Sequence, residues 1–251
     1  GAVAVEYAMR RNRWRGALGF DLGEGFSKGE GLGLREDIRH EQILVATERV
    51  EVFGEGDEVA GHDLGSLMDH LIEGVLIPTE KRNTACVSSQ IGCSLTCKFC
   101  ATGQMDRKRN LDFEEIYDQV AILNEQSEKV YGKKLTNIVY MGMGEPLLNY
   151  KNVLKSIDKI TASDSMNMSP KRITVSTAGV AKMIKQLGDD KVRFNLALSL
   201  HAPTDKKRNE IMPINESNTI DHLIEALNYF YDQTKNDITL EYILFKDKNR
   251  E

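Results

Sequence analysis

The amino-acid sequence predicts an α/β protein in which helices cover a parallel sheet. Short apolar runs, several of them rich in β-branched residues, alternate with stretches in which apolar residues recur at helical spacing. This alternation is typical of parallel sheets, because a parallel connection must be long enough to hold a crossover helix. The apolar runs occupy residues 85–88, 138–141, 173–176, 194–200 and 239–245. We therefore expect five buried strands.

The segments between these runs have the features of amphipathic helices. Phe113, Ile116 and Val120 share one helical face, and Asp112 and Glu115 stand at the two positions of a capping box. Similar apolar stripes occupy residues 153–157, 180–187 and 220–227. We expect each of these stretches to cover the sheet.

The N-terminal quarter of the chain differs from the rest in composition. Residues 1–66 hold 12 of the 20 glycines and show little sustained periodicity. Residues 43–53 alternate loosely, as a strand or a hairpin would. We therefore divide the chain into a segment of unclear fold, residues 1–66, and a core, residues 67–251.

Composition and charge set limits on the class of protein. The chain has 41% hydrophobic and 28% charged residues, which is ordinary for a globular protein. It has no apolar run of roughly 18 residues and no opening signal peptide, so we expect a cytoplasmic protein with no membrane partner. The net charge of −5 disfavours non-specific binding of nucleic acid by the whole surface. Residues 81–110 nevertheless hold six basic residues and one acid, either as a phosphate-binding stripe or as a solvated loop.

The most informative residues are Cys93, Cys97 and Cys100, spaced C-x3-C-x2-C. Three thiolates can hold three corners of a four-iron cluster and leave one iron open to a ligand. Zinc is the alternative, with Cys86 as a fourth ligand, although structural zinc sites usually pair two short knuckles across a longer gap. A redox pair at Cys97 and Cys100 would leave the third cysteine unexplained. The spacing favours an iron–sulfur cluster.

Further candidates follow the predicted strands, where the working face of a parallel α/β fold lies. The candidates are Gly142 to Pro146, Ser176, and Ser199 to His201. Each also has a structural interpretation, as a strand-to-helix turn or a satisfied polar group. Glu73 alone would be a surface acid. Cys86 would be either a packing residue or a nucleophile.

Four stretches taken together closely resemble the RlmN/Cfr family of radical SAM RNA methyltransferases. They are residues 85–103, 141–149, 176–179 and 199–202. The resemblance runs from about residue 71 to the C-terminus, and residues 73–104 are closer to the adenine-C2 branch, RlmN, than to the C8 branch, Cfr. It implies an incomplete radical SAM (β/α) partial barrel that stops after about the fifth strand. Residues 1–66 do not resemble the helical accessory domain of the family.

The resemblance assigns a role to each candidate. Cys93, Cys97 and Cys100 would ligate a [4Fe-4S] cluster whose open iron is chelated by S-adenosylmethionine. The residues that would contact this cofactor are Gly144, Glu145, Ser176, Ser199, Leu200 and His201. Glu73 corresponds to the proton acceptor of the family. Cys86 corresponds to the thiol that resolves a covalent RNA adduct by forming a disulfide.

The resemblance also implies the reaction of the full-length protein. This reaction is methylation of adenine C2 in 23S rRNA and tRNA, with an external electron donor such as a flavodoxin-type reductant. In the family a second cysteine near the C-terminus carries the methyl group, and this chain has no counterpart because its four cysteines are accounted for. We therefore expect a partial chain that binds the cluster without completing turnover. The alternatives are C8 methylation and a non-catalytic zinc-binding RNA module.

Overall fold

The computed structural model describes residues 3–9, 41–46, 52–53 and 71–245. The chain divides into two compact units. The first, here called the cysteine unit, is Asp37–Ser176, and the second, the carboxyl unit, is Gly1–Glu36 with Thr177–Glu251. The boundary expected between residues 66 and 67 lies outside the described residues.

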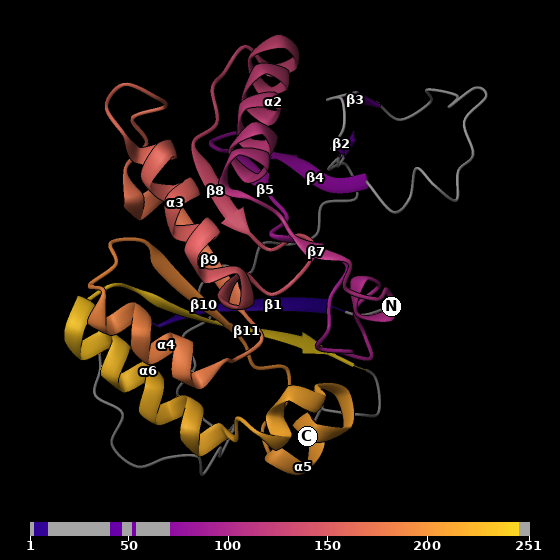
Figure 1. The fold of residues 1–251 in the computed structure, drawn as a ribbon, viewed down its shortest axis with the longest axis vertical. Helices are drawn as coiled ribbons and strands as arrows, with labels where there is room; N and C mark the ends of the chain where they lie inside the picture. The colour runs from indigo at the N-terminus through magenta and orange to yellow at the C-terminus, as the bar shows by residue number, and fades with distance from the viewer. Residues whose placement is uncertain (1–2, 10–40, 47–51, 54–70, 246–251) are drawn as a thin grey trace. The chain divides into compact units, whose positions relative to one another are not determined.

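The sheet of the cysteine unit has a parallel part and an antiparallel extension (Figure 1). β5 (Asn83–Cys86), β8 (Asn137–Tyr140) and β9 (Ile173–Thr177) are neighbours in parallel pairs. β4 (Leu71–Pro78) pairs antiparallel with β5, and β2 (Glu41–Ala46) pairs antiparallel with β4 and with β3 (Val52–Phe53). The first three predicted strands are confirmed, and residues 43–53, expected to form a strand or a hairpin, contribute the antiparallel pair of β2 and β3.

Two helices cover this sheet. α2 (Phe113–Tyr131) begins at the predicted capping box: Asp112 Oδ1 accepts from Glu114 N and Glu115 N, each at 2.9 Å, and Glu115 Oε2 accepts from Asp112 N at 2.9 Å. The buried face of α2 includes Ile116, Val120 and Leu123. α2 packs on β4, on β5 and on α3 (Tyr150–Thr161). Shorter elements are η1 (Thr102–Gln104), η2 (Pro146–Asn149), η3 (Pro170–Arg172) and the antiparallel pair β6 (Gln90–Ile91) and β7 (Arg109–Asn110).

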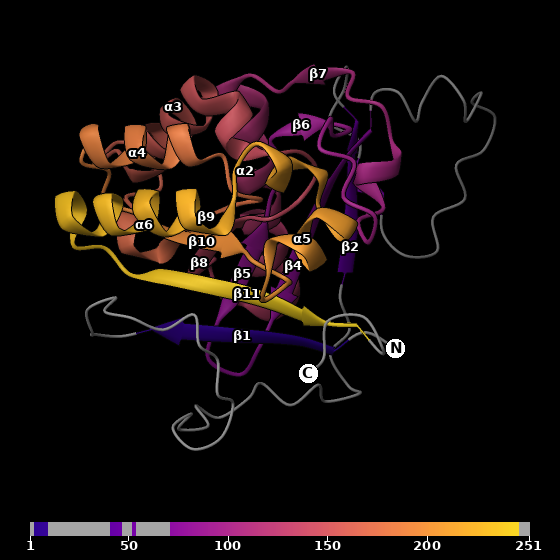
Figure 2. The ribbon, with the colours of Figure 1, turned by 90° about the horizontal axis from the view of Figure 1, so that it is seen from below.

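The carboxyl unit contains the last two predicted strands, which form a parallel pair. β10 (Asn195–Ser199) lies beside β11 (Ile238–Leu244), and β11 pairs on its other side, antiparallel, with β1 (Val3–Met9). α4 (Ala181–Asp189) packs along α6 (Ile220–Thr234), as Figure 2 shows. α5 (Asp205–Ile211) and η4 (Pro213–Glu216) lie between β10 and α6 in the chain. Within the described residues, no helix combines the length and the apolar character needed to cross a bilayer.

Candidate functional site

The three clustered cysteines lie on a short loop between β6 and η1 that is closed by backbone hydrogen bonds. Cys100 N donates to Cys97 O at 3.2 Å, Gly103 N donates to Cys100 O at 3.1 Å, and Cys93 N donates to Met105 O at 3.3 Å. A Cβ on Gly103 would lie 2.6 Å from Cys97 O, so only glycine allows this close approach. Backbone hydrogen bonds therefore hold all three cysteines in one compact loop.

The thiols of this loop differ in burial. Cys97 is buried, whereas Cys93 and Cys100 are half-buried. Burial is the main cause that raises the pKa of the Cys93 thiol, and the nearby Glu145 carboxylate and Cys100 raise it further. The Cys93 thiol is thus protonated and in electrostatic reach of Cys100. A bound metal would reverse this state, because a coordinating thiol is deprotonated.

Strand register places Glu73 and Cys86 on one face of the sheet. Val75 lies opposite Cys86 in the antiparallel pair of β4 and β5. Opposite residues share a face, and so do residues two positions apart on a strand, which puts Glu73 on the same face as Cys86. Burial agrees with this alternation, since Ile72 and Leu76 are buried on the opposite face while Glu73, Val75 and Cys86 are half-buried.

The same face continues across the parallel strands to Ser176. Cys86 is in register with Val139 on β8, and Val139 is in register with Thr174 on β9. Ser176 lies two residues beyond Thr174 and therefore points to the same side. Glu73, Cys86 and Ser176, three residues singled out from the sequence, thus share one face of the cysteine unit.

The glycine-rich turn after β8 packs against the segment that leads into the cysteine loop. Gly144 has a φ of +94°, and a Cβ there would lie 2.5 Å from Gln90 Cβ. A Cβ on Gly142 would lie 2.5 Å from Ser88 Oγ. Glu145 N donates to the Oε1 of the buried Gln90 at 2.8 Å. The two glycines therefore allow contact between the turns that follow β5 and β8.

The buried Glu145 side chain caps the short helix that follows it. Its Oε1 accepts from Leu147 N at 3.0 Å at the start of η2. A carboxylate has two oxygens with about four lone-pair sites, so the bond to Leu147 N does not by itself saturate it. The structural role and the cofactor-binding role expected for Glu145 are therefore compatible.

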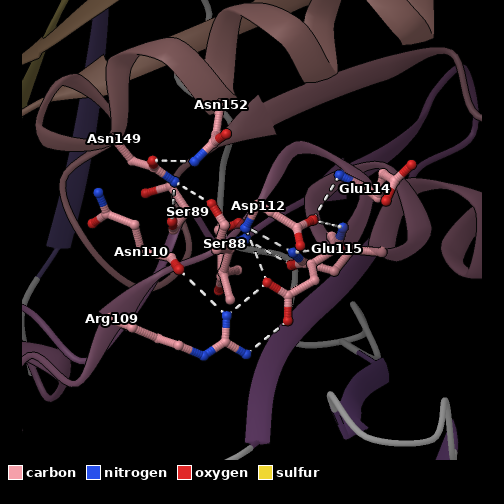
Figure 3. Close-up of polar contacts among 11 residues, drawn as sticks. Ser88, Ser89, Arg109, Asn110, Asp112, Glu114, Glu115, Asn149 and Asn152 are labelled. Atoms are coloured by element: carbon pink, nitrogen blue, oxygen red, sulfur yellow. Dashed lines mark hydrogen bonds and ion pairs between the residues drawn. The ribbon is translucent and has the colours of Figure 1, made fainter.

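Two buried amides, neither of them predicted from the sequence, hold this region together. Gln119 of α2 binds both backbone groups of Ser88. Ser88 N donates to Gln119 Oε1 at 2.8 Å, and Gln119 Nε2 donates to Ser88 O at 3.1 Å. Asn149 Nδ2 donates to Ser89 O at 2.8 Å and to Leu111 O at 2.7 Å, as drawn for Ser89 in Figure 3. Both amides satisfy backbone groups just before the cysteine loop.

Ser88 connects three segments of the site. Its Oγ donates to Glu73 O at 2.7 Å and accepts from Met143 N at 2.8 Å. Ser88 is fully buried, so these bonds are made in a region that excludes water. The backbone at Glu73, the approach to the cysteine loop and the glycine-rich turn are therefore fixed to one another.

The basic stripe of residues 81–110 is partly neutralised. Arg109 makes a two-pronged ion pair with Glu115, with Nη1–Oε2 and Nη2–Oε1 distances of 2.7 Å, and Figure 3 shows this pair beside the α2 cap. Arg107 Nη1 donates to Asn110 Oδ1 at 3.0 Å while the side chain stays exposed. Arg109 therefore stabilises the start of α2 rather than contributing an unpaired cation to a phosphate site.

In the carboxyl unit, the turn after β10 is fastened to β11. Ser199 Oγ hydrogen-bonds Glu241 Oε2 at 2.9 Å, and Leu200 N and His201 N donate to Glu241 O at 3.0 and 3.3 Å. Ile243 N donates to His201 Nδ1 at 3.2 Å. His201 is buried with a φ of +56°. Burial and then the charge of Arg208 lower its pKa to about 4. His201 is thus a neutral acceptor that anchors this turn.

Comparison with known proteins identifies the class to which these features belong. Residues 87–251 match the family model of the Radical SAM superfamily. The chain belongs to this superfamily. A crystal structure of a radical SAM methyltransferase from Sphaerobacter thermophilus superposes with a TM-score of 0.66 at 34% identity, over 80% of this chain and 55% of that one.

Similar sequences from several bacteria carry one name. The probable dual-specificity RNA methyltransferase RlmN of Cytophaga hutchinsonii is 62% identical over 72% of this chain and 49% of that protein. The protein of the same name from Salinibacter ruber is 43% identical over 94% of this chain and 65% of that protein. The chain spans about half the length of the first of these relatives.

The cysteine loop of this radical SAM chain supplies the kind of donor atoms that bind an iron–sulfur cluster. Such clusters are held by thiolates, and three thiols here lie in one loop whose backbone a glycine keeps closed. All four cysteines lie in the described part of the chain as thiols outside any disulfide. Among the described residues, no three His, Cys, Asp or Glu side chains are already gathered into a metal site. The fit therefore rests on the loop and its chemistry rather than on a preformed ligand set.

Proposed function

We propose that this chain is the radical SAM part of an RNA methyltransferase that modifies adenine C2 in 23S rRNA and tRNA. The observation that carries the proposal is the placement of Glu73 and Cys86 on one sheet face, in a unit that also holds the three-cysteine loop. The names of the similar proteins support the substrate class, since each is described as an RNA methyltransferase. A cytoplasmic location goes with these substrates.

Each candidate residue has a place in this proposal. Cys93, Cys97 and Cys100 would hold the [4Fe-4S] cluster. Gly144, Glu145 and Ser176 in the cysteine unit, and Ser199, Leu200 and His201 in the carboxyl unit, would bind and orient S-adenosylmethionine. The bound cofactors supply the radical chemistry that a non-nucleophilic adenine carbon requires, with an electron from a donor such as a flavodoxin-type reductant. The chain's own task is placement of the base and movement of its proton.

Glu73 and Cys86 would act on the adenine itself. Diagonal neighbours on an antiparallel pair lie about 7–8 Å apart, a span that a flat base can bridge. A carboxylate on one side and a thiol on the other could then reach the same ring, with Glu73 taking the C2 proton and Cys86 resolving the covalent adduct. The bond between Ser88 Oγ and Glu73 O fixes the backbone that carries the carboxylate.

This proposal uses all four cysteines of the chain. The methyl-carrying cysteine of the family therefore has no counterpart within these 251 residues. We expect the chain alone to bind its cofactors without methylating RNA. The similar proteins carry the RlmN name, which favours C2 over C8 methylation and over the zinc-binding module. Mass spectrometry of RNA modified by the full-length protein distinguishes 2-methyladenosine from 8-methyladenosine.

Anaerobic reconstitution with iron and sulfide tests the cluster. The wild-type chain should take up both and turn brown, and Cys97→Ala should lose the chromophore. Cys86→Ala is the matched control and should keep it, because Cys86 lies on β5 outside the loop. Zinc bound without sulfide, or a Cys97→Ala variant with the wild-type spectrum, would overturn the cluster assignment.

A further inference from the structure

Arg208 on α5 is the largest of the fully buried side chains in the described residues. Its guanidinium donates to two backbone carbonyls at the end of β10, with Nη2–Ser199 O and Nε–Leu200 O distances of 3.1 Å each. It also donates to Ala178 O, just after β9, with an Nη2–O distance of 2.6 Å. One side chain therefore holds the backbone that follows two strands.

A second set of hydrogen bonds, through Asn215 and Asp205, fixes the position of this guanidinium. Nη1 donates to Asn215 Oδ1 at 2.6 Å, and Asn215 Nδ2 donates to Asp205 Oδ1 at 2.8 Å. Asp205 Oδ1 also accepts from Ile220 N at 2.9 Å at the start of α6. The charge of Arg208 is thereby linked through an amide to a carboxylate that is fixed by a helix terminus.

Gly179 leaves room for the side chain of Arg208. Gly179 has a φ of +106°, and a Cβ there would lie 3.2 Å from Arg208 Nη2 and 2.9 Å from Leu223 Cδ2. A side chain at position 179 would push against the guanidinium or the core of α6. Burial of a charge costs several kcal/mol unless its donors are satisfied, so the cluster of acceptors around Arg208 accounts for its placement.

We propose that Arg208 is the positioning residue for S-adenosylmethionine in the carboxyl unit. It fixes the carbonyls of Ala178, Ser199 and Leu200, and so sets the backbone of residues 178–179 and 199–201. The inference rests on the proposed function, which makes Ser199 to His201 cofactor contacts. Because Arg208 is fully buried, its effect would pass through these two backbone segments.

Lysine cannot replace arginine in this role. The guanidinium is a planar fork whose N–H groups point in fixed directions, whereas an ammonium is a point charge on a flexible stem. Arg208→Lys keeps the charge but cannot reach all three carbonyls and Asn215 Oδ1 together. We expect Arg208→Lys to bind S-adenosylmethionine about tenfold more weakly or worse, while iron and sulfide content stays unchanged because the cysteine loop belongs to the other unit.

Asn236 provides a matched control at the opposite end of the same strand. Its Nδ2 donates to Val192 O at 2.6 Å and to Phe194 O at 2.9 Å, just before β10 begins. Asn236→Ala therefore also releases buried carbonyls next to β10 and lowers stability. It should leave the affinity for S-adenosylmethionine within about twofold of wild type, because residues 199–201 keep their anchor.

Two measurements on the reconstituted chain separate the outcomes. Equilibrium dialysis with labelled S-adenosylmethionine gives the affinity, and hydrogen exchange without cofactor gives the protection of residues 178–179 and 199–201. Faster exchange in these segments with weaker binding in Arg208→Lys, and neither effect in Asn236→Ala, supports the proposal. Wild-type affinity in a folded Arg208→Lys protein, or equal losses in both variants, overturns it.

A milder variant covers the case in which Arg208→Lys does not fold. Asn215→Ser removes the Oδ1 acceptor of Nη1 and leaves the three carbonyl bonds, so we expect a smaller loss of affinity and faster exchange at residues 199–201. Unchanged exchange and affinity in Asn215→Ser would then reject the positioning role. A wild-type chain that binds no S-adenosylmethionine would instead defeat the proposed function, whereas the exchange measurement tests the anchoring by itself.

Discussion

Glu73 and Cys86 lie on the same face of the sheet, as diagonal neighbours across the antiparallel pair of β4 and β5. The relationship depends on register, because a slip of one residue would turn Glu73 to the face covered by α2. Ser88 reinforces the register by donating its hydroxyl to Glu73 O at 2.7 Å. A carboxylate and a thiol are thus held a short distance apart by backbone pairing rather than by a flexible loop.

An engineered disulfide tests this register. Val75 lies opposite Cys86, and opposite residues of an antiparallel pair have Cα atoms about 4.5–5.5 Å apart, within the range that a disulfide spans. Val75→Cys should therefore form a bond to Cys86 on mild oxidation, which peptide mapping by mass spectrometry would identify. Ile77→Cys is the control, since it shares the face but lies opposite Thr84. A bond from position 77 and none from position 75 would show that the register is wrong.

The strands and the α2 cap were predictable from the sequence because both have local signals. Apolar runs mark β5, β8, β9, β10 and β11, and Asp112 with Glu115 marks the start of α2. The antiparallel extension through β4 was not predictable, because pairing between strands depends on contacts that periodicity along one strand does not encode. Gln119 gave no signal either, since a glutamine beside apolar helix residues is ordinarily a boundary position. Arg208 lies on a seven-residue helix with no apolar stripe, so its burial emerges only from the tertiary structure.

Crowding at Gly144 should make its replacement costly. A Cβ there would meet Gln90 Cβ at 2.5 Å in addition to the strain of a φ of +94°. Gly132 is a matched control, because its φ is +63° and a Cβ added at this position would meet nothing within 4 Å. We expect Gly132→Ala to lower the free energy of unfolding by about 1 kcal/mol and Gly144→Ala by roughly 3 kcal/mol or more. Urea unfolding of both variants measures the difference, and equal losses would show that Gln90 gives way to the added methyl group.

Loss of the Gln119 amide should destabilise the cysteine unit. Gln119→Leu keeps a similar volume but leaves the N–H and C=O of the buried Ser88 without these partners. Each unsatisfied buried group costs about 1–3 kcal/mol, so we expect the free energy of unfolding to fall by roughly 2–4 kcal/mol. Gln186→Leu on α4 is the control, because that glutamine bonds an exposed Asp190. Chemical denaturation that finds the two variants alike would mean that water replaces the amide at Ser88.

His201 should make the folded state sensitive to mild acid. Its pKa is lowered from an ordinary value of 6.5 to about 4, first by burial and then by Arg208. Because the unfolded chain takes up this proton more readily, the stability that depends on neutral His201 is complete above pH 6.5 and is lost as the pH falls toward 4. A shift of this size corresponds to roughly 3 kcal/mol. We therefore expect unfolding midpoints to fall over this window.

His201→Asn separates this effect from the titration of carboxylates. Asparagine tolerates the left-handed φ of +56° and offers an oxygen to Ile243 N, but it does not titrate. The variant should lose less stability than wild type between pH 6.5 and about pH 4. All other titratable side chains are the same in the two proteins. If His201→Asn has the wild-type slope instead, protonation of His201 does not drive the loss of stability.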